Sequence, residues 1–419
     1  MAVLGIFAMV LVLLVMRQNI IVILLASAAY VHLVWGEGKL GYLAEDLWIS
    51  LDNPLLLAIP MFLLAGNLMT RGSIVRRLIK LAIEITKPLP GGLAVATIIS
   101  CAVFAGISGS SPVTLLAVGS VMYPALLANG YSKRFALGAL TSGGTLGIVI
   151  PPSIPLILYG IVTENSIADL FLAGVIPGLM ITLVLAVYSL LVNRNMPAQK
   201  LDLVALKRSL RDGIWALMLP VIMLGGIYSG YFSATEAAAV ALAYGILVEA
   251  FVYREIKLVD AYETALETAR LLGMLFPIVA VALSLKTILT IENIPDQLAL
   301  WITDITSSKV TFLLAVNALL LLVGCLFDVV SAILVLAPLL LIPAVAYGID
   351  PIHFGILMVI NLEIGFLTPP MGLNLIVAMT AFKESFGTIV RSVLPFVFLI
   401  FTVLLVVTFV PWTALALTG

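Results

Sequence analysis

The chain has 419 residues, of which 63% are hydrophobic and only 10% are charged, and its net charge is −1. Soluble domains carry about a quarter charged residues, so this composition excludes a soluble protein and indicates one that crosses a membrane many times. The near-neutral charge and the lack of a basic tail exclude nucleic acid as a partner. The two cysteines lie in separate apolar runs, so we expect no disulfide.

The first predicted elements are a membrane helix over residues 1–16 and an amphipathic arm over residues 70–87. Residues 1–16 lack the basic start and the cleavage motif of a signal peptide, so we expect this helix to be retained. The arm carries basic residues on an apolar helix, which is typical of a helix that lies in the membrane interface. The basic residues of the arm and of the connector over residues 194–212 predict that both segments are cytoplasmic.

Two hairpins are predicted from apolar runs that polar turns interrupt. Residues 91–128 contain the turn GISGSSP at 106–112, and residues 310–347 contain the turn DVVS at 328–331. Each run is too short on either side of its turn to span the bilayer comfortably twice, so we predict re-entrant hairpins with tips near mid-membrane. Glycines permit the tight turn, and serine hydroxyls supply neutral oxygen ligands.

Two Pro-Pro pairs, Pro151–Pro152 and Pro369–Pro370, interrupt other apolar stretches. Proline removes a backbone donor and clashes with the carbonyl four residues earlier, so each pair breaks a membrane helix and frees backbone groups. Broken backbone at membrane depth is tolerated only where it is buried in protein or lines a cavity. The two breaks therefore predict where the cavity lies.

The second break repeats the first at an offset of 218 residues, which holds without a gap from 146–177 to 364–395. The bias of Lys and Arg places GYSKRF (130–135) inside the cell and its counterpart GIDPIH (348–353) outside. The same model places TENS (163–166) outside and its counterpart FKES (382–385) inside. Two halves with the same landmarks and opposite sidedness form an inverted-topology repeat, which is the sequence signature of a secondary transporter.

Polar residues and freed carbonyls gather at the tips and breaks, which predicts the binding site there. Hard cations such as sodium prefer such oxygens, and we predict one cation between each hairpin and the break of its own half. The residues expected to bind these cations are Ser108, Ser110, Gly144, Thr145, Pro151, Asp328, Glu363, Thr368 and Pro369. The residues expected to bind the solute are Ser108, Gly109, Ser110, Ser111, Pro152, Ser153, Asp328, Ser331, Pro370, Gly372 and Asn374. Asp328 is alternatively a cap of hairpin two, and Glu363 is alternatively a partner in an ion pair.

Two other classes of function use similar features. The sequence GISG at 106–109 matches the G-x-S-G around the nucleophile of rhomboid-type intramembrane proteases, which need a histidine base. His32 lies in an early helix and His353 in a predicted loop at the periplasmic surface, so we expect no catalytic dyad and no enzyme. A channel would need a continuous pore, whereas hairpins that enter from both sides favour alternating access.

Five long segments resemble the large membrane subunit of TRAP transporters, the tripartite ATP-independent periplasmic carriers of the ion-transporter superfamily. They are IPMFLLAGNLMTRGSI (59–74), FAGISGSSPVTLLAVGSVMYP (104–124), GTLGIVIPPSIPLILYG (144–160), GGIYSGYFSATEAAAVA (225–241) and HFGILMVINLEIGFLTPPMGLNL (353–375). The resemblance implies a multi-pass protein of the bacterial inner membrane, surrounded by membrane lipid, that works by an elevator mechanism. It also implies Na+ as the coupling ion, no organic cofactor, and two partners: a small four-helix membrane subunit and a periplasmic substrate-binding protein.

We therefore expect an all-α polytopic membrane protein in which a transport domain, with both hairpins and both broken helices, slides against a scaffold. The expected scaffold comprises residues 1–90, 171–266 and 392–419, and the expected transport domain comprises residues 91–170 and 267–391. The expected solute is an anionic organic acid, either sialic acid or a C4-dicarboxylate. A carrier or channel that works without a binding protein is the alternative.

Overall fold

The computed structural model describes residues 5, 8, 9, 12, 13, 16, 18, 20–35, 40–306 and 308–418. Within these residues the chain is helical without strands, and nine helical stretches are long and apolar enough to cross a membrane. The predicted all-α polytopic fold is therefore confirmed. The helix expected over residues 1–16 lies mostly outside the described residues.

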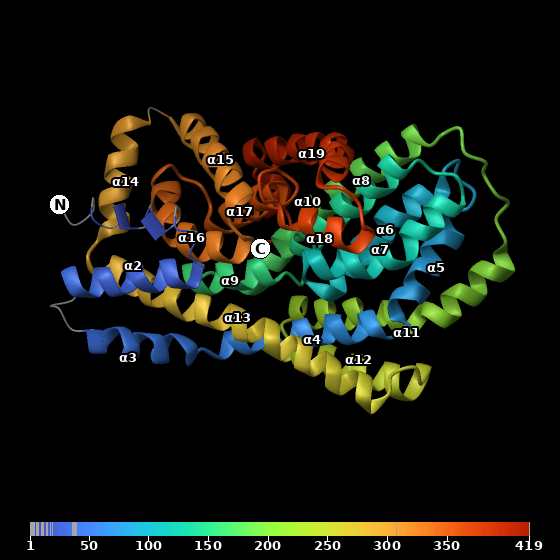
Figure 1. Ribbon diagram of the computed structural model, residues 1–419, viewed down its shortest axis with the longest axis horizontal. Coiled ribbons are helices and arrows are strands. Elements are labelled where there is room, and N and C mark those ends of the chain that lie inside the picture. Colours follow the sequence, from blue (N-terminus) through green and yellow to red (C-terminus); the bar gives the residue numbers. More distant parts are fainter. Residues whose placement is uncertain are drawn as a thin grey trace.

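The N-terminal helices pack along the 34-residue helix α13 (Leu258–Ile291) at one side of the molecule (Figure 1). They are α2 (Ile20–Val34), α3 (Leu40–Leu51) and, after the short helix η1 (Pro54–Leu57), α4 (Ala58–Arg71). At a rise of 1.5 Å per residue, α13 is about 50 Å long and exceeds the apolar core of a bilayer. Leu24, Ala28 and Leu43 form a small cluster with Val281, separate from the main core, so α13 is the support of α2 and α3.

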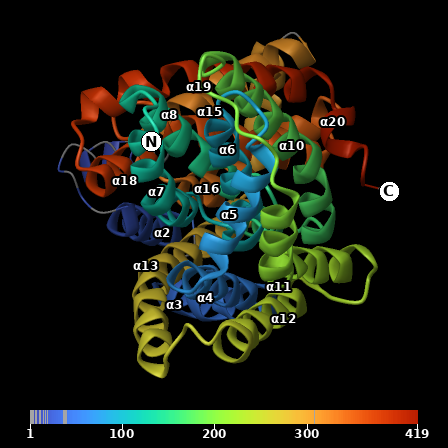
Figure 2. The same ribbon diagram turned by 90° about the vertical axis from the view of Figure 1, so that its right-hand side faces the viewer.

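The predicted arm is α5 (Ile74–Thr86), whose apolar face is buried against α6 and α11 (Figure 2). The helices that follow the connector are α11 (Leu203–Tyr228), α12 (Ala234–Leu247) and the π-helical stretch η3 (Val248–Tyr253). The buried carboxylate of Glu249 accepts hydrogen bonds from the backbone N–H groups of Ser73 at 2.8 Å and Ile74 at 2.9 Å. This carboxylate from η3 satisfies orphan donors at the start of α5 and fixes the arm to the end of α12.

The same succession of five helices occurs twice in the rest of the chain. The first set is α6 (Gly92–Ser108), α7 (Ser111–Ala128), α8 (Lys133–Gly144), α9 (Ile154–Thr163) and α10 (Ile167–Val192). The second set is α15 (Lys309–Leu326), α16 (Val329–Ala346), α17 (Pro351–Phe366), α18 (Leu373–Phe382) and α19 (Phe386–Phe409). The remaining helices are α14 (Ile294–Ile305) and α20 (Trp412–Leu415). Both hairpins and both helix breaks lie where the sequence predicts them, whereas their depth in a membrane and their opposite sidedness stay predictions.

Local capping chemistry explains why these helices begin at matching positions. The hydroxyl of Ser132 accepts from the third residue of α8, and the carboxylate of Asp350 accepts from the start of α17. The hydroxyls of Ser166 and Ser385 cap α10 and α19 in the same way. Short polar side chains of this kind satisfy the free N–H groups of a first helical turn, so both sets carry their own start signals.

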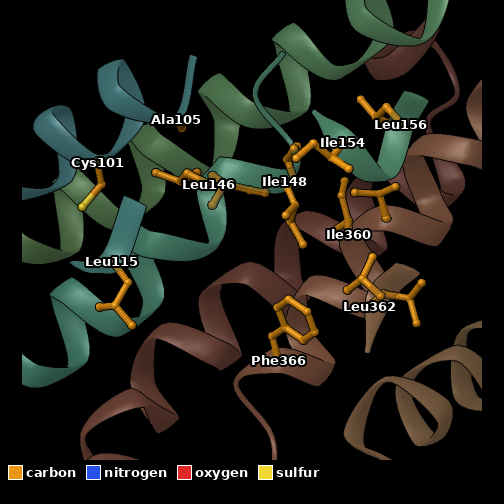
Figure 3. Close-up of a cluster of buried hydrophobic side chains, with 14 of the residues drawn as sticks. Cys101, Ala105, Leu115, Leu146, Ile148, Ile154, Leu156, Ile360, Leu362 and Phe366 are labelled. Carbon is orange, nitrogen blue, oxygen red and sulfur yellow. The ribbon is translucent and has the colours of Figure 1, made fainter. Parts of the chain in front are cut away.

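The main core lies where the two sets meet. Figure 3 shows apolar side chains from α6, α7, α9, α17 and the short helix η2 (Thr145–Ile148) in one cluster. The hydroxyl of Tyr159 in α9 donates to the carbonyl of Pro351 at 2.7 Å. A Cβ on Gly355 would lie only 2.6 Å from the ring of Tyr159, so the close packing of α9 on α17 requires glycine there.

Three of the four expected domain boundaries fall inside continuous helices, and the fourth, after residue 90, falls in the turn between α5 and α6. Residue 170 lies in α10, residue 266 in α13 and residue 391 in α19. The division into scaffold and transport domain stays a prediction, and these three helices would then belong to both domains.

Candidate functional site

The tips of both hairpins line one cavity of about 470 Å³. Hairpin one contributes Gly109, Ser110 and Ser111, and hairpin two contributes Asp328 and Val329. Figure 1 places α6 and α7 in the right-hand half of the molecule and α15 and α16 in the left-hand half, so the hairpins reach the cavity from opposite ends. The structure thus brings together two turns that are more than two hundred residues apart.

Gly109 docks the tip of hairpin one onto the first break. It has a φ of +60°, and a Cβ there would lie 2.8 Å from the carbonyl oxygen of Pro152. The carbonyl of Gly109 accepts a hydrogen bond from the backbone N–H of Ile154 at 3.3 Å. In the second set, the N–H of Met371 donates to the carbonyl of Cys325 at 3.2 Å. Each hairpin is therefore bonded, backbone to backbone, to the break of its own set.

Hydroxyl groups order the turn of hairpin one from within. The buried hydroxyls of Ser108 and Thr114 lie 2.7 Å apart, and Thr114 also lies 2.9 Å from the carbonyl oxygen of Ser110. The buried hydroxyl of Ser111 accepts from the side-chain amide of Asn374 at 2.6 Å. Asn374 lies in the first turn of α18, directly after the second break. This hydrogen bond therefore connects the second break to hairpin one.

Asp328 caps the first turn of α16 and also lines the cavity. Its carboxylate accepts from the backbone N–H of Ser331 at 2.9 Å and from the hydroxyl of Ser331 at 2.6 Å. The alternative role predicted for Asp328, a cap of hairpin two, is therefore present. A role in binding an ion is compatible with it, since a carboxylate has further lone pairs to offer.

Thr145 and Glu363 bridge the two sets at equivalent positions. The hydroxyl of Thr145 lies 2.5 Å from Oε1 of Glu363, which is 218 residues further along the chain, and 2.6 Å from the carbonyl oxygen of Ser142. Glu363 is fully buried, and its Oε2 has no hydrogen-bond partner. No ion pair to Glu363 occurs in the part of the chain that the structure describes, so the ion-pair alternative for Glu363 finds no partner there.

The two breaks differ in exposure. Both Pro-Pro peptide bonds are cis, but Pro151 and Pro152 are buried whereas Pro369 and Pro370 are exposed. Ser153 caps α9, and its hydroxyl donates to the carbonyl of Ile148 at 2.5 Å. Exposed irregular backbone is not tolerated against lipid, so the second break must face water or another protein chain.

Several expected site residues do not line the cavity. Among the described residues these are Ser108, Gly144, Thr145, Pro151, Pro152, Ser153, Ser331, Glu363, Thr368, Pro369, Pro370, Gly372 and Asn374. Thr368 bonds back to the carbonyl of Ile364 at 2.7 Å, and Gly144 packs against Leu115. Their roles in binding cations or the solute stay predictions.

The sequence pattern did not predict one wall of the cavity. It is formed by α13 through Leu271, Met274, Leu275 and Ile278, which share one helical face. The signal for this wall is only the spacing of these positions. Residues 271–285 carry no charge on any side of the helix, so in this stretch the spacing is not distinctive. No Lys, Arg or His lines the cavity within the described ranges.

The histidines do not form a catalytic dyad with the GISG serine. His353 lies in the first turn of α17, not in a loop as predicted; its Nε2 is buried and lies 2.8 Å from the carbonyl oxygen of Val407. In the other histidine, His32, a single ring nitrogen makes both polar contacts. Its Nε2 lies 3.3 Å from the hydroxyl of Ser284 and 3.5 Å from the carboxylate of Asp46. A Ser-His-Asp triad uses both ring nitrogens, so this arrangement is not one.

Comparison with known proteins decides the class of protein. Residues 7–413 match the family model described as "Tripartite ATP-independent periplasmic transporter, DctM component". The chain belongs to this family. It is a multi-pass transport protein of the inner membrane and not an enzyme, which excludes the protease alternative.

Relatives that match at least nine-tenths of this chain agree that it is a TRAP transporter permease. It is 42% identical over 394 residues to the C4-dicarboxylate TRAP transporter large permease protein DctM of Pseudomonas aeruginosa, covering 93% of this chain and 92% of that one. It is 40% identical over 380 residues to the isethionate TRAP transporter permease protein DctMQ of Oleidesulfovibrio alaskensis, covering 90% of this chain and 60% of that one. The crystal structure of the Alcanivorax borkumensis YdaH transporter aligns with a TM-score of 0.62 at 16% identity, over 91% of this chain and 89% of that one, and so shares the fold.

Proposed function

We propose that the permease imports a small organic anion through the cavity between the hairpin tips, driven by sodium. A periplasmic binding protein delivers the anion, and a small membrane subunit completes the complex. The observation that carries the proposal is the meeting of two hairpin tips, from opposite ends of the molecule, at one cavity. In a member of the TRAP family, this is the arrangement that alternating access requires.

The solute class follows from the relatives and from the size of the cavity. Relatives of nearly equal identity are named for a C4-dicarboxylate and for isethionate, so the shared property is a small molecule with an oxyanion group. A volume of about 470 Å³ lies within the usual range for small-molecule sites, roughly 300 to 1,000 Å³. We favour a C4-dicarboxylate or a related organic acid, with sialic acid as the larger alternative.

The charge of the cavity supports coupling to a cation. The only ionisable side chain in the described lining is the carboxylate of Asp328, which repels an anionic solute. A bound sodium ion offsets this repulsion, so solute and ion bind better together than apart. The solute itself faces hydroxyl groups and the N-termini of α7 and α16, which favour negative charge.

The donor set at the breaks fits sodium better than a transition metal. Within the described residues no cluster of three His, Cys, Asp or Glu side chains occurs, and sodium prefers neutral oxygens. Buried oxygens without a hydrogen-bond partner remain on Thr141, Ser142, Glu363 and Asn374. Glu363 is itself an expected cation ligand, and Thr141 and Ser142 lie a few residues before the expected ligands Gly144 and Thr145. Each inward sodium ion would contribute about 2.3 kcal/mol per 100 mV of membrane potential.

Ion pairs at the surface support the inverted orientation of the two sets. Lys133 pairs with Glu384 at 2.5 Å, and both lie in segments predicted to be cytoplasmic. Lys286 pairs with Glu164 at 2.8 Å, and Glu164 lies in a segment predicted to be periplasmic. The bond between Thr145 and Glu363 joins a residue to its own counterpart, as expected for positions near a two-fold pseudo-axis. An elevator movement of the two sets together is part of the proposal.

The deciding experiment measures uptake by proteoliposomes that contain this chain and its small subunit, with labelled succinate, isethionate or sialic acid. We expect accumulation of one solute that needs both an inward sodium gradient and the cognate binding protein. Accumulation without sodium would refute the coupling. Flux that is independent of the binding protein and never exceeds equilibrium would establish the channel alternative.

A further inference from the structure

A second, polar cavity of about 190 Å³ lies between the arm helix α5 and the first turns of α11. Figure 2 shows these two helices side by side, below the end of α6. Ser73, Arg76, Arg77 and Lys80 line it from the side of α5. All four carry hydrogen-bond donors, so this wall is suited to an anion.

The guanidinium of Arg77 is held in place before any ligand arrives. Its Nε donates to the hydroxyl of Ser73 at 3.1 Å, and the group lies 4.0 Å from the centre of the Tyr253 ring. Arg76 and Arg77 both pair with the carboxylate of Glu255, at 2.9 and 3.1 Å. A guanidinium group that is already ordered loses little conformational entropy when it binds an anion.

The charges that line the cavity leave one positive charge without compensation. Arg76, Arg77 and Lys80 supply three positive charges, and Glu255 and Asp212 supply two negative ones. Lys80 is exposed and has no ion-pair partner within the described residues. A ligand group with a single negative charge would therefore neutralise the cavity.

Ser209 of α11 provides an independent indication of a ligand. Its side chain is only 1% exposed, it lines the cavity, and its hydroxyl has no hydrogen-bond partner among the residues that the structure describes. Buried hydroxyls are nearly always bonded, so this donor lacks an acceptor that a bound group would supply. An oxyanion between Ser209 and the basic residues of α5 would satisfy it.

The place of the cavity in the fold indicates where the anion comes from. Asp212 directly precedes the apolar part of α11, and the residues before it are basic. The predicted orientation therefore puts the cavity at the level of the cytoplasmic headgroups. Leu203, Val204 and Leu210 are exposed beside it on α11, where acyl chains could pack. We propose that this cavity binds a phosphate group of one negative charge, presented by an anionic phospholipid of the cytoplasmic leaflet or as soluble phosphate.

The test uses the purified full-length chain in detergent and measures binding through the thermal unfolding midpoint. Titrations are made with phosphatidylglycerol, with phosphatidylcholine and with inorganic phosphate against chloride at equal ionic strength. The test variant is Lys80→Gln with Ser209→Ala. The matched control is Lys207→Gln, which removes the same charge from an exposed position of α11 outside the cavity.

We expect phosphatidylglycerol to stabilise the protein at concentrations where phosphatidylcholine does not, and the test variant to need about tenfold more of it while the control stays within about twofold. A response to inorganic phosphate that the test variant loses would assign the site to a soluble phosphate. Equal responses of the test variant and the control to every ligand would overturn the proposal. Because the assay measures no transport, this result is independent of the proposed function.

Discussion

At the scale of single residues, the contact of Gly109 with the first break predicts how one substitution changes uptake. Gly109→Ala should lower uptake at least about tenfold, because the new Cβ would push against the carbonyl of Pro152 and displace the tip. The control is Gly230→Ala, which has a similar φ of +75° but no atom within 4 Å of the added Cβ. Both variants carry the same backbone strain of about 1 kcal/mol, so equal losses of uptake would contradict the docking role.

The bridge between Thr145 and Glu363 predicts an effect on stability. Thr145→Val should destabilise the protein by about 2 kcal/mol, because it leaves both oxygens of a buried carboxyl group without a partner. Thr402→Val is the control, since the exposed hydroxyl of Thr402 bonds only to the carbonyl of Phe398. Thermal unfolding in detergent measures both, and an equal change in the two midpoints would show that the bridge contributes nothing.

At the scale of elements, the ion pair between Glu164 and Lys286 ties the end of α9 to α13. The hydrogen bond from Lys286 lowers the pKa of Glu164 below its usual 4.5. A lowered pKa stabilises the folded state above that value and ceases to do so as the pH falls through the folded pKa. The side chain of Glu164 is 81% exposed, so the contribution is below about 1 kcal/mol.

Lys286→Gln should therefore be less stable than the parent chain at neutral pH, and the difference should shrink as the pH falls below 4.5 and through the lowered pKa of Glu164. The measurement is the unfolding midpoint of both chains across this range of pH. The exposed substitution Lys383→Gln, for which no ion pair is described, is the control and should show no such trend. A difference that persists in acid would mean that Lys286 acts through packing and not through Glu164.

At the scale of the whole molecule, the inverted orientation can be tested with one pair of positions. Glu164 and Lys383 are both left-handed C-caps, the first of α9 and the second of α18, and so occupy equivalent places in the two sets. Glu164→Cys should react with a membrane-impermeant maleimide from the periplasm, and Lys383→Cys only from the cytoplasm. Labelling is measured on intact and on permeabilised cells.

The background for this labelling is the chain with Cys101→Ala and Cys325→Ser, which removes both native thiols. Glu292→Cys, at the end of α13 beyond Lys286, is the positive control for the periplasmic side. Labelling of Glu164→Cys and Lys383→Cys from the same side would contradict the inverted repeat and, with it, the alternating-access mechanism.

The class of fold and the places where helices break follow from the amino-acid sequence without reference to the tertiary structure. Its composition requires a membrane, and prolines at 151–152 and 369–370 interrupt helices through their own covalent structure, wherever the chain packs. Polar caps such as Ser132 and Asp350 act within four residues of themselves. Such local effects can be read from the order of residues alone.

Only the tertiary structure decided which residues meet in space. It placed Asp328 and Ser110 around one cavity, joined Thr145 to Glu363, and made one face of α13 a wall of that cavity. It also buried His353 in a helix. The physical reason is that helices in a membrane are apolar on the faces toward lipid and toward protein alike, so hydrophobicity does not mark the side that packs. Contacts between distant residues depend instead on the fit of surfaces, which is settled only when the helices assemble.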